Sequence, residues 1–447
     1  MCIRDRVRTV RALDRKIFAL AIPALGALVA EPLFIALDSA MVGHLGAANL
    51  AGLSVASAIL QTAIGLMVFL AYATTPLVAR SFGAGNLRGA VQAGVDGLYL
   101  AAGIGVFLSV TLWLIHAPLV ALFDLEPPAA AAARTYLVIS LAGVPAMLLT
   151  LAATGLLRGL QDTKTPLWIA GVGFAANAAL NAVLIYGLGL GIAGSALGTV
   201  IAQWGMAAVY LAVIGRAVRA HGASWRLDRQ GLKSVSGIGG WLFVRTFGLR
   251  IALLATVGAA TAHGTEATAA YHVVFTVFSL LAFALDALAI ASQTLIGAAL
   301  GAHDTEQVRF VLRRSLVWGT VAAVVFALPI ALGAPWIGYG FSNDPVVIAA
   351  ITPALWVLAA SLAVPAWVFV LDGVLMGSGD ARYLAWTSLV NVAMYLPVLW
   401  WVWSQAASVS VSHYTTLLTA AYSLGYMAAR LLTLGVRARG EKWLVLG

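Results

Sequence analysis

Charged residues are scarce in this sequence. Only 10% of its 447 residues are Asp, Glu, Lys or Arg, whereas 62% are hydrophobic. Soluble globular proteins carry a charged fraction of about 25%, so this composition excludes the soluble classes and indicates a membrane protein. The formal net charge of +9 does not indicate nucleic-acid binding, because the basic residues fall between apolar segments.

Cysteine is nearly absent as well. A single cysteine, Cys2, excludes an internal disulfide and a cysteine-ligated zinc site. The sequence also lacks a GxxxxGK[ST] phosphate-binding loop, an HExxH metal motif and paired DxxxD motifs. We therefore expect neither ATP use nor enzyme activity, and no cofactor or bound metal beyond a transported ion.

Long apolar runs are what the sequence does contain. Each is about as long as the roughly 20 residues that cross a bilayer, and the first, from Ile17 to Met41, is too long for a signal peptide. An all-α fold with twelve transmembrane helices is therefore predicted. The expected spans are 16–41, 50–74, 91–115, 132–157, 165–187, 190–214, 236–261, 268–296, 309–333, 347–375, 383–403 and 412–435.

Basic residues fall in alternate connections, such as "ARSFGAGNLRG" and "GRAVRAHGASWRLDRQGLK". Because Lys and Arg accumulate on the cytoplasmic side, these connections and both termini are predicted to be cytoplasmic. The predicted domains are an N-terminal segment (1–15), an N-lobe (16–214), a linker (215–235), a C-lobe (236–435) and a tail (436–447).

The two halves of the chain resemble each other at a fixed spacing. Three loop segments of the first half recur in the second, all with the same offset: they begin at Gly46 and Gly264, near Gly83 and Gly301, and at Gly155 and Gly373. The chain is therefore predicted to be a duplicated six-helix unit with pseudo-twofold symmetry. Two such bundles typically enclose a cavity that opens to alternate sides, which indicates a transporter driven by an ion gradient or running downhill.

Asp38 is the principal candidate for ion coupling. It lies in the apolar stretch "EPLFIALDSAMVGHLG", six residues after Pro32, which permits a helix bend. A carboxylate at the bilayer centre costs about 2.5–3.5 kcal/mol, so it generally faces a cavity or binds a proton. The alternative is that Asp38 lies near the outer end of its span and is hydrated there.

Other polar residues within the spans are candidates for a cavity or for helix packing. Asn177 and Asn181 are four residues apart and therefore share one helix face, as do Thr199 and Gln203. Such groups also hydrogen-bond between membrane helices for packing alone. The remaining candidates are Glu31, Gln61, Asp286 and Asp372, and a structural pairing of Asp372 with Arg245 or Arg250 is the alternative to a role in transport.

Several segments together resemble the MATE family of multidrug and toxic-compound extruders, and specifically its DinF-like branch. They are "LAIPALGALVAEPLFIALDSAMVGHLGAANLAGLSVA", "GLLRGLQDTKTP", "NAALNAVLIYGLGLGIAGSALGT" and "LDGVLMGSGDARY", and the resemblance covers nearly the whole chain. It implies a V-shaped cavity between the lobes and export of an organic, cationic or amphipathic substrate in exchange for H⁺ or Na⁺. We expect a monomer in the bacterial inner membrane, although the sequence contains no signal for the oligomeric state.

The resemblance assigns roles to individual residues. Asp38 matches the essential acid of the first helix, and Asn177 and Asn181 match the polar pair of the fifth. Asp372 resembles the tenth-helix acid of the sodium-linked branch, and Asp286 falls where DinF-like members often carry an eighth-helix acid.

One residue departs from the family pattern. The position of Asn181 commonly holds Asp, and an amide cannot titrate, so Asp38 would carry the charge change largely alone. Amide oxygens can also ligate Na⁺, so H⁺ and Na⁺ both remain candidates. The alternative function is a lipid-linked-oligosaccharide flippase of the same superfamily, which would need more cavity arginines than Arg245 and Arg250.

Overall fold

The computed structural model of the protein describes residues 3–444, with side chains from residue 10 onward. Across this range all regular elements are helical, and each of the twelve predicted spans corresponds to one helical segment or to one bent pair of helices. Ten segments are long and apolar enough to cross a membrane. Two bent helix pairs, Pro127–Leu141 with Val144–Gly159 and Pro345–Ser361 with Ala363–Gly377, bring the number to twelve. The prediction of an all-α, multi-pass membrane protein is confirmed.

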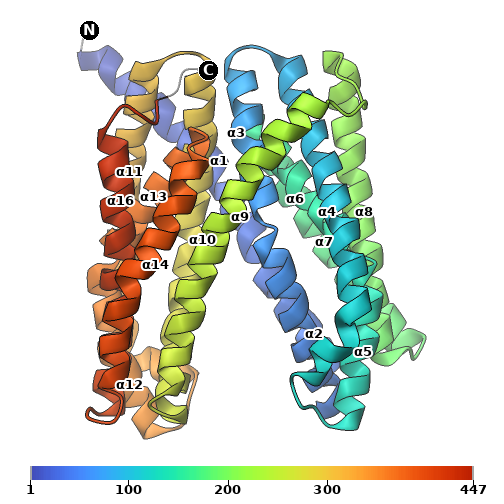
Figure 1. The fold of residues 1–447 in the computed structure, drawn as a ribbon, viewed down its shortest axis with the longest axis vertical. Helices are drawn as coiled ribbons and strands as arrows, with labels where there is room; N and C mark the ends of the chain where they lie inside the picture. Colours follow the sequence, from blue (N-terminus) through green and yellow to red (C-terminus); the bar gives the residue numbers. More distant parts are fainter. Residues whose placement is uncertain (1–2, 445–447) are drawn as a thin grey trace. The chain divides into compact units, whose positions relative to one another are not determined.

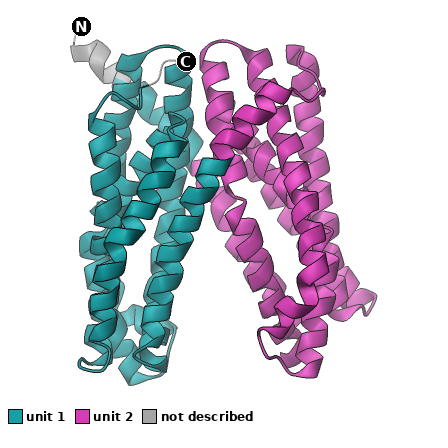
Figure 2. Cartoon of the chain, in the orientation of Figure 1, with its two compact units in different colours: residues 1–21, 240–447 teal, residues 22–239 magenta. Residues whose placement is uncertain are grey.

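The helices divide into two compact units (Figures 1 and 2). Unit 2 is Ile22–Gly239, and unit 1 is the chain before and after it. The first half contains α1 (Ile3–Gly43), α2 (Ala47–Leu66), α3 (Phe69–Gly83), α4 (Leu87–Ala121), α5 (Pro127–Leu141), α6 (Val144–Gly159), α7 (Lys164–Ala182), the π-helical turn η1 (Val183–Gly187) and α8 (Gly191–His221). The second contains α9 (Arg229–Thr261), α10 (Thr265–Gly301), α11 (Thr305–Ile337), the 3₁₀ turn η2 (Gly338–Gly340), α12 (Pro345–Ser361), α13 (Ala363–Gly377), α14 (Ala381–Ser404), α15 (Val411–Ala420), the π-helical turn η3 (Ala421–Tyr426) and α16 (Met427–Arg439).

The units depart from the predicted lobes at two helices. The N-lobe was expected to begin at residue 16, but α1 belongs to unit 1 up to Ala21 and to unit 2 from Ile22. The linker was expected to occupy 215–235, but α8 runs to His221 and α9 starts at Arg229. Unit 2 then includes α9 as far as Gly239. The first helix of each half thus begins in the unit formed mainly by the other half.

Polar contacts hold the beginning of α1 within unit 1. Arg314 of α11 donates two hydrogen bonds to the Asp14 carboxylate, both at 2.7 Å, and the Trp318 indole donates a third at 2.8 Å. The Phe18 ring packs edge-on against Trp318, with the centroids 4.4 Å apart. These contacts show that the end of the predicted N-terminal segment (1–15) continues into α1 and packs on α11 of unit 1.

The beginning of α9 is held within unit 2 by α4. The carboxylate of Asp96 accepts the Asp228 backbone N–H at 3.1 Å, and Gln92 donates to the Arg226 carbonyl at 3.1 Å. Asp96 is buried, and no candidate role was predicted for it. An anionic side chain at the N-terminal end of a helix also interacts favourably with the helix dipole.

The predicted duplication is visible in backbone contacts inside each unit. A Cβ on Gly155 would lie 2.6 Å from the Ala71 carbonyl oxygen, and one on Gly373 would lie 2.4 Å from the Ala289 carbonyl oxygen. The second pair is related to the first by the offset of the sequence repeat. Positive φ angles recur with the same offset, at Gly46 and Gly264, Gly85 and His303, and Gln161 and Gly379. The repeat therefore preserves close helix packing and turn geometry, not only the hydrophobic pattern.

The bent spans also occupy equivalent places in the two halves. The bend between α5 and α6 is 51° and that between α12 and α13 is 50°. Pro145 and Pro365 lie in the first turn of α6 and of α13, where a missing backbone N–H removes no intrahelical hydrogen bond. Proline thus permits a new helix to begin directly after each bend.

Candidate ion-coupling site

Asp38 is the centre of a buried hydrogen-bond network in unit 2. Only 5% of this residue is exposed, although it lies on a predominantly apolar helix. Asn181 of α7 and Ser195 of α8 both donate to its Oδ1, at 2.8 and 2.6 Å. The Tyr136 hydroxyl of α5 donates to Oδ2 at 3.3 Å. Four helices therefore meet at one carboxylate, and the expectation of a hydrated acid at the end of its span is not supported.

Asn177 extends this network by one helical turn. Its amide nitrogen donates to Thr199 Oγ1 at 3.1 Å, and both residues are buried. The side-chain oxygens of Asn177 and Asn181 are buried and accept no hydrogen bond within the described part of the chain. Buried carbonyl oxygens are normally paired, so these two oxygens are available to a cation or a donor that enters the site.

The other predicted residues of unit 2 lie outside this network. Gln203 is half-buried, and its side-chain oxygen points to Gly143 at the bend between α5 and α6. Glu31 and Gln61 are exposed on α1 and α2. Of the candidate cavity residues predicted in the first half, Thr199 alone lies beside the Asp38 group.

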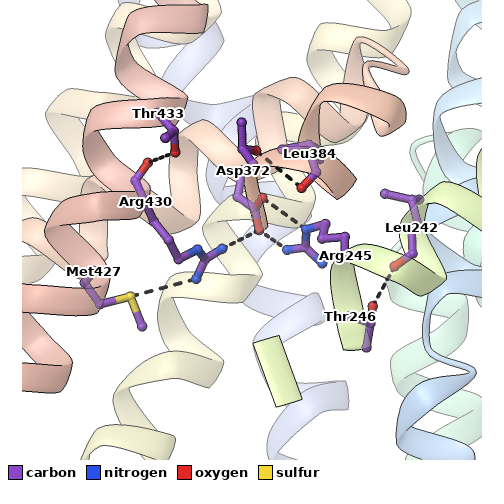
Figure 3. A network of polar contacts seen from close by, with 9 residues as sticks. Leu242, Arg245, Thr246, Asp372, Leu384, Met427, Arg430 and Thr433 are labelled. Carbon is purple, nitrogen blue, oxygen red and sulfur yellow. Dashed lines mark hydrogen bonds and ion pairs between the residues drawn. The ribbon is translucent and has the colours of Figure 1, made fainter. Parts of the chain in front are cut away.

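Asp372 has a different environment in unit 1. Arg245 of α9 contacts it with two guanidinium nitrogens, Nε donating to Oδ1 at 3.2 Å and Nη2 to Oδ2. Arg430 of α16 donates to Oδ2 at 3.0 Å (Figure 3). All three side chains are more than nine-tenths buried. The structure therefore supports the structural alternative for Asp372, with Arg245 as one partner. The other partner, Arg430, was not among the predicted residues.

The position equivalent to Asp38 in unit 1 carries no charge. At the offset of the repeat, Thr256 corresponds to Asp38 and Tyr395 corresponds to Asn177. Their hydroxyls are 2.6 Å apart and buried. Asp286 is half-buried on α10, a helix that does not correspond to α1. The duplication has thus retained a polar pair at this position while the carboxylate is found in one half alone.

Two members of the Asp38 network were missed by the sequence analysis. Ser195 lies one helical turn before Thr199 and two before Gln203, so extending that pattern by one turn would have included it. Tyr136 follows no such pattern, because a single tyrosine near the start of a span is also typical of interface anchoring. Its contact with Asp38 depends on how α5 packs beside α1.

A duplicated set of twelve apolar helices, with a buried carboxylate at the centre of one half, defines a multi-pass membrane transporter. Comparison with known proteins agrees. The sequence profile of the MatE family matches residues 23–183 and 242–401. Protein DETOXIFICATION 44, chloroplastic, of Arabidopsis thaliana is 30% identical over 389 residues, which cover 84% of this chain and 74% of that protein.

Further relatives match a similar share of the chain. DNA damage-inducible protein F of Escherichia coli (strain K12) is 27% identical over 378 residues, covering 82% of this chain and 81% of its own length. The crystal structure of the Vibrio cholerae MATE transporter VcmN in the bent form has the same fold, with a TM-score of 0.87 at 21% identity over 98% of this chain and 99% of that one. The chain belongs to the MatE family of membrane transporters, and the resemblance seen in the sequence is confirmed.

Proposed function

We propose that this chain is a secondary antiporter that exports organic, amphipathic compounds in exchange for a cation bound at Asp38. The observation that supports this proposal is the convergence of four helices of unit 2 on one buried carboxylate. Such a group is costly within a bilayer unless it binds an ion or a proton. We further propose that the protein works in a bacterial plasma membrane, since DNA damage-inducible protein F is a bacterial relative.

H⁺ and Na⁺ would use the same residues differently. A proton would bind the Asp38 carboxylate itself, and Asn181 would remain a hydrogen-bond donor. Sodium would bind Asp38 together with the side-chain oxygens of Asn177 and Asn181, which have no hydrogen-bond donor among the described residues. Ser195 and Thr199 would supply hydroxyl oxygens in that case, and hard cations prefer such oxygen ligands.

Cation exchange at Asp38 can be coupled to a change in α1. This helix contains Pro23 and Pro32 and continues without a break through both. Pro32 lies six residues from Asp38, and each proline removes one backbone hydrogen bond and lowers the cost of bending. A cation that neutralises Asp38 would weaken its charge-assisted hydrogen bonds from α7 and α8 and change how the outer part of α1 packs in unit 2.

The test uses the purified protein in liposomes that contain a pH-sensitive dye. A proton gradient and then a sodium gradient are imposed in the presence of an organic dye substrate, for the wild type, Asp38→Asn and Glu126→Gln. Glu126 is exposed in a connecting loop and makes no cap hydrogen bond, so its variant controls for the loss of one carboxylate.

The expected result is gradient-driven substrate movement in the wild type and in Glu126→Gln, and none in Asp38→Asn. Counterflow of protons would identify H⁺ as the exchanged ion, whereas movement under a sodium gradient alone would identify Na⁺. Full gradient-driven transport by a normally inserted Asp38→Asn protein would contradict the proposal. Absence of transport by the wild type under both gradients would favour the flippase alternative.

A further inference from the structure

Arg250 is a charged side chain at the middle depth of a membrane span. It lies about three helical turns before the end of α9 at Thr261, which corresponds to about 16 Å along the helix. The hydrocarbon layer is about 30 Å thick, so this position is near its centre. Arg250 is exposed on the surface of the chain, in contrast to the buried Arg245 on the same helix. An exposed arginine at this depth requires an explanation, because it is costly in lipid and generally marks a substrate pathway.

Two carboxylates of the described chain lie within the predicted spans of unit 1, Asp372 and Asp286, and neither neutralises Arg250. Asp372 already accepts hydrogen bonds from Arg245 and Arg430. Asp286 lies about 31 Å along α10 from its start at Thr265, and therefore about 15 Å deeper than Arg250. Arg250 itself makes no hydrogen bond or ion pair among the described residues. Its guanidinium is thus available to an anion.

Two aromatic rings lie at the same depth as Arg250. Phe275 lies about 15 Å along α10 from the start of that helix. Tyr422 lies in η3, which continues α15, and is about 16 Å along this continuous helix from its start at Val411. The end of α9 and the start of α15 lie together, because the Tyr414 hydroxyl of α15 donates to the Ala259 carbonyl of α9 at 2.7 Å. The start of α10 follows the end of α9 directly in the sequence. The rings of Phe275 and Tyr422 are in edge-to-face contact, with centroids 6.4 Å apart. Both residues are partly exposed.

Buried aromatic rings pack against Phe275 and Tyr422. Phe278 is edge-on to Tyr422 at 5.5 Å, and Tyr426 is tilted against it at 5.6 Å. Tyr395 packs on Tyr426 at 5.2 Å and also contacts Tyr422 at 6.4 Å. The rings of Tyr422 and Phe275 are therefore held in place by packing, so little conformational entropy is lost when a ligand ring stacks on them.

Polar groups accompany this aromatic surface. Arg250 lies at the same depth as Tyr422, on a helix that the Tyr414–Ala259 hydrogen bond joins to α15. The Tyr426 hydroxyl is buried and has no hydrogen-bond partner within the described chain. Tyr422 and Tyr426 both lie in the π-helical turn η3, and such turns are frequent at functional sites. On α10, His272 and Ser279 flank Phe275 on one face, which is atypical of a surface in contact with lipid.

We propose that unit 1 carries a subsite for planar aromatic carboxylates. The guanidinium of Arg250 pairs with the carboxylate, and the rings of Tyr422 and Phe275 stack on the aromatic part of the substrate. The unpaired guanidinium repels organic cations, so the subsite selects substrate charge. This inference rests on the proposed export function and specifies the class of substrate, whereas the Asp38 network in unit 2 concerns the exchanged ion.

The test is equilibrium binding to the purified full chain in detergent, which needs no ion gradient. Naphthoate and naphthylmethylammonium are the probes, because they share one ring system and carry opposite charges. The variants are Arg250→Gln, Arg250→Lys, Tyr422→Ala and Tyr422→Phe. Arg313→Gln is the matched control, since Arg313 is an exposed arginine near the start of α11. Size-exclusion chromatography and thermal unfolding establish that each variant is folded.

We expect the wild type and Arg313→Gln to bind naphthoate and not the ammonium probe. Arg250→Gln should weaken naphthoate binding by about 10- to 100-fold, the effect of losing a hydrogen bond between charged groups. Arg250→Lys should restore part of this affinity. Tyr422→Ala should weaken binding by about 3- to 10-fold, and Tyr422→Phe should retain the stacking contribution.

Three outcomes would overturn the inference: no naphthoate binding at millimolar concentration, equal binding of the two probes, or unchanged affinity in a folded Arg250→Gln protein. The proposed antiport can fail independently of these results. If Asp38→Asn transports normally while Arg250→Gln loses naphthoate binding, the subsite stands and the coupling residue was wrongly assigned.

Discussion

Replacement of Asp372 by Asn is predicted to destabilise unit 1 strongly. The side chains of Asp372, Arg245 and Arg430 are 8–9% exposed, and the carboxylate accepts three hydrogen bonds from the two guanidinium groups. Asparagine keeps one oxygen acceptor but removes the negative charge, which leaves two buried cations without this anionic partner. Breaking a buried ion pair in this way costs about 3–5 kcal/mol. Because the three residues lie on α9, α13 and α16, the loss should affect the packing of all three helices.

The free energy of unfolding is measured by denaturant titration in mixed micelles, with Glu441→Gln as the matched control. Glu441 pairs with Arg309 at 2.5 Å, but both side chains are more than half exposed. An exposed pair contributes about 0–1 kcal/mol, so the control should unfold close to the wild type. Equal stability of the two variants, or a stabilised Asp372→Asn protein, would refute the argument that the buried charges depend on Asp372.

Two further predictions concern packing and the ion site. Gly373→Ala should destabilise the protein by about 1–3 kcal/mol in thermal or denaturant unfolding, because the new methyl group would overlap the Ala289 carbonyl oxygen. The control is Gly258→Ala on α9, where the methyl group would enter open space, and this variant should be neutral or slightly stabilising. A Gly373→Ala protein as stable as Gly258→Ala would show that the close contact between α10 and α13 is not required. Ser195→Ala removes the 2.6 Å hydrogen bond to Asp38 and should change the cation concentration for half-maximal transport by about 3- to 10-fold with little change in stability. An unchanged ion dependence would exclude Ser195 from the coupling site.

Much of the fold could be predicted because it depends on local properties. The twelve spans follow from the lengths of the apolar runs, which the bilayer thickness fixes. The duplication follows from recurrence at one spacing, and the contacts of Gly155 and Gly373 show that the same spacing governs backbone packing. The bends after α5 and α12 were not predicted, because the apolar pattern continues through both and the prolines beside them are also compatible with a straight first turn.

The candidate site was predicted in part, because some of its features also depend on local properties of the sequence. Asn177 and Asn181 share a helix face whatever the tertiary structure, because they are four residues apart. Asp38 stands alone in an apolar span, and the free-energy cost of placing a carboxylate in a bilayer is enough to indicate a functional group. The partners of Asp38 could not be inferred in this way. Tyr136 and Ser195 lie far from it along the chain, so their contacts depend on the packing of helices that no local pattern specifies.

The sequence by itself determined the number and length of the membrane spans, the repeat, and the isolated acids, since each depends on composition or on periodicity within one segment. The tertiary structure alone decided how these acids are used. It surrounds Asp38 with hydrogen-bond donors from three other helices, pairs Asp372 with Arg245 and Arg430, and leaves Arg250 exposed. The physical reason is that hydrogen bonds and ion pairs act over a few ångströms, and only the packing of distant segments brings such groups within that range.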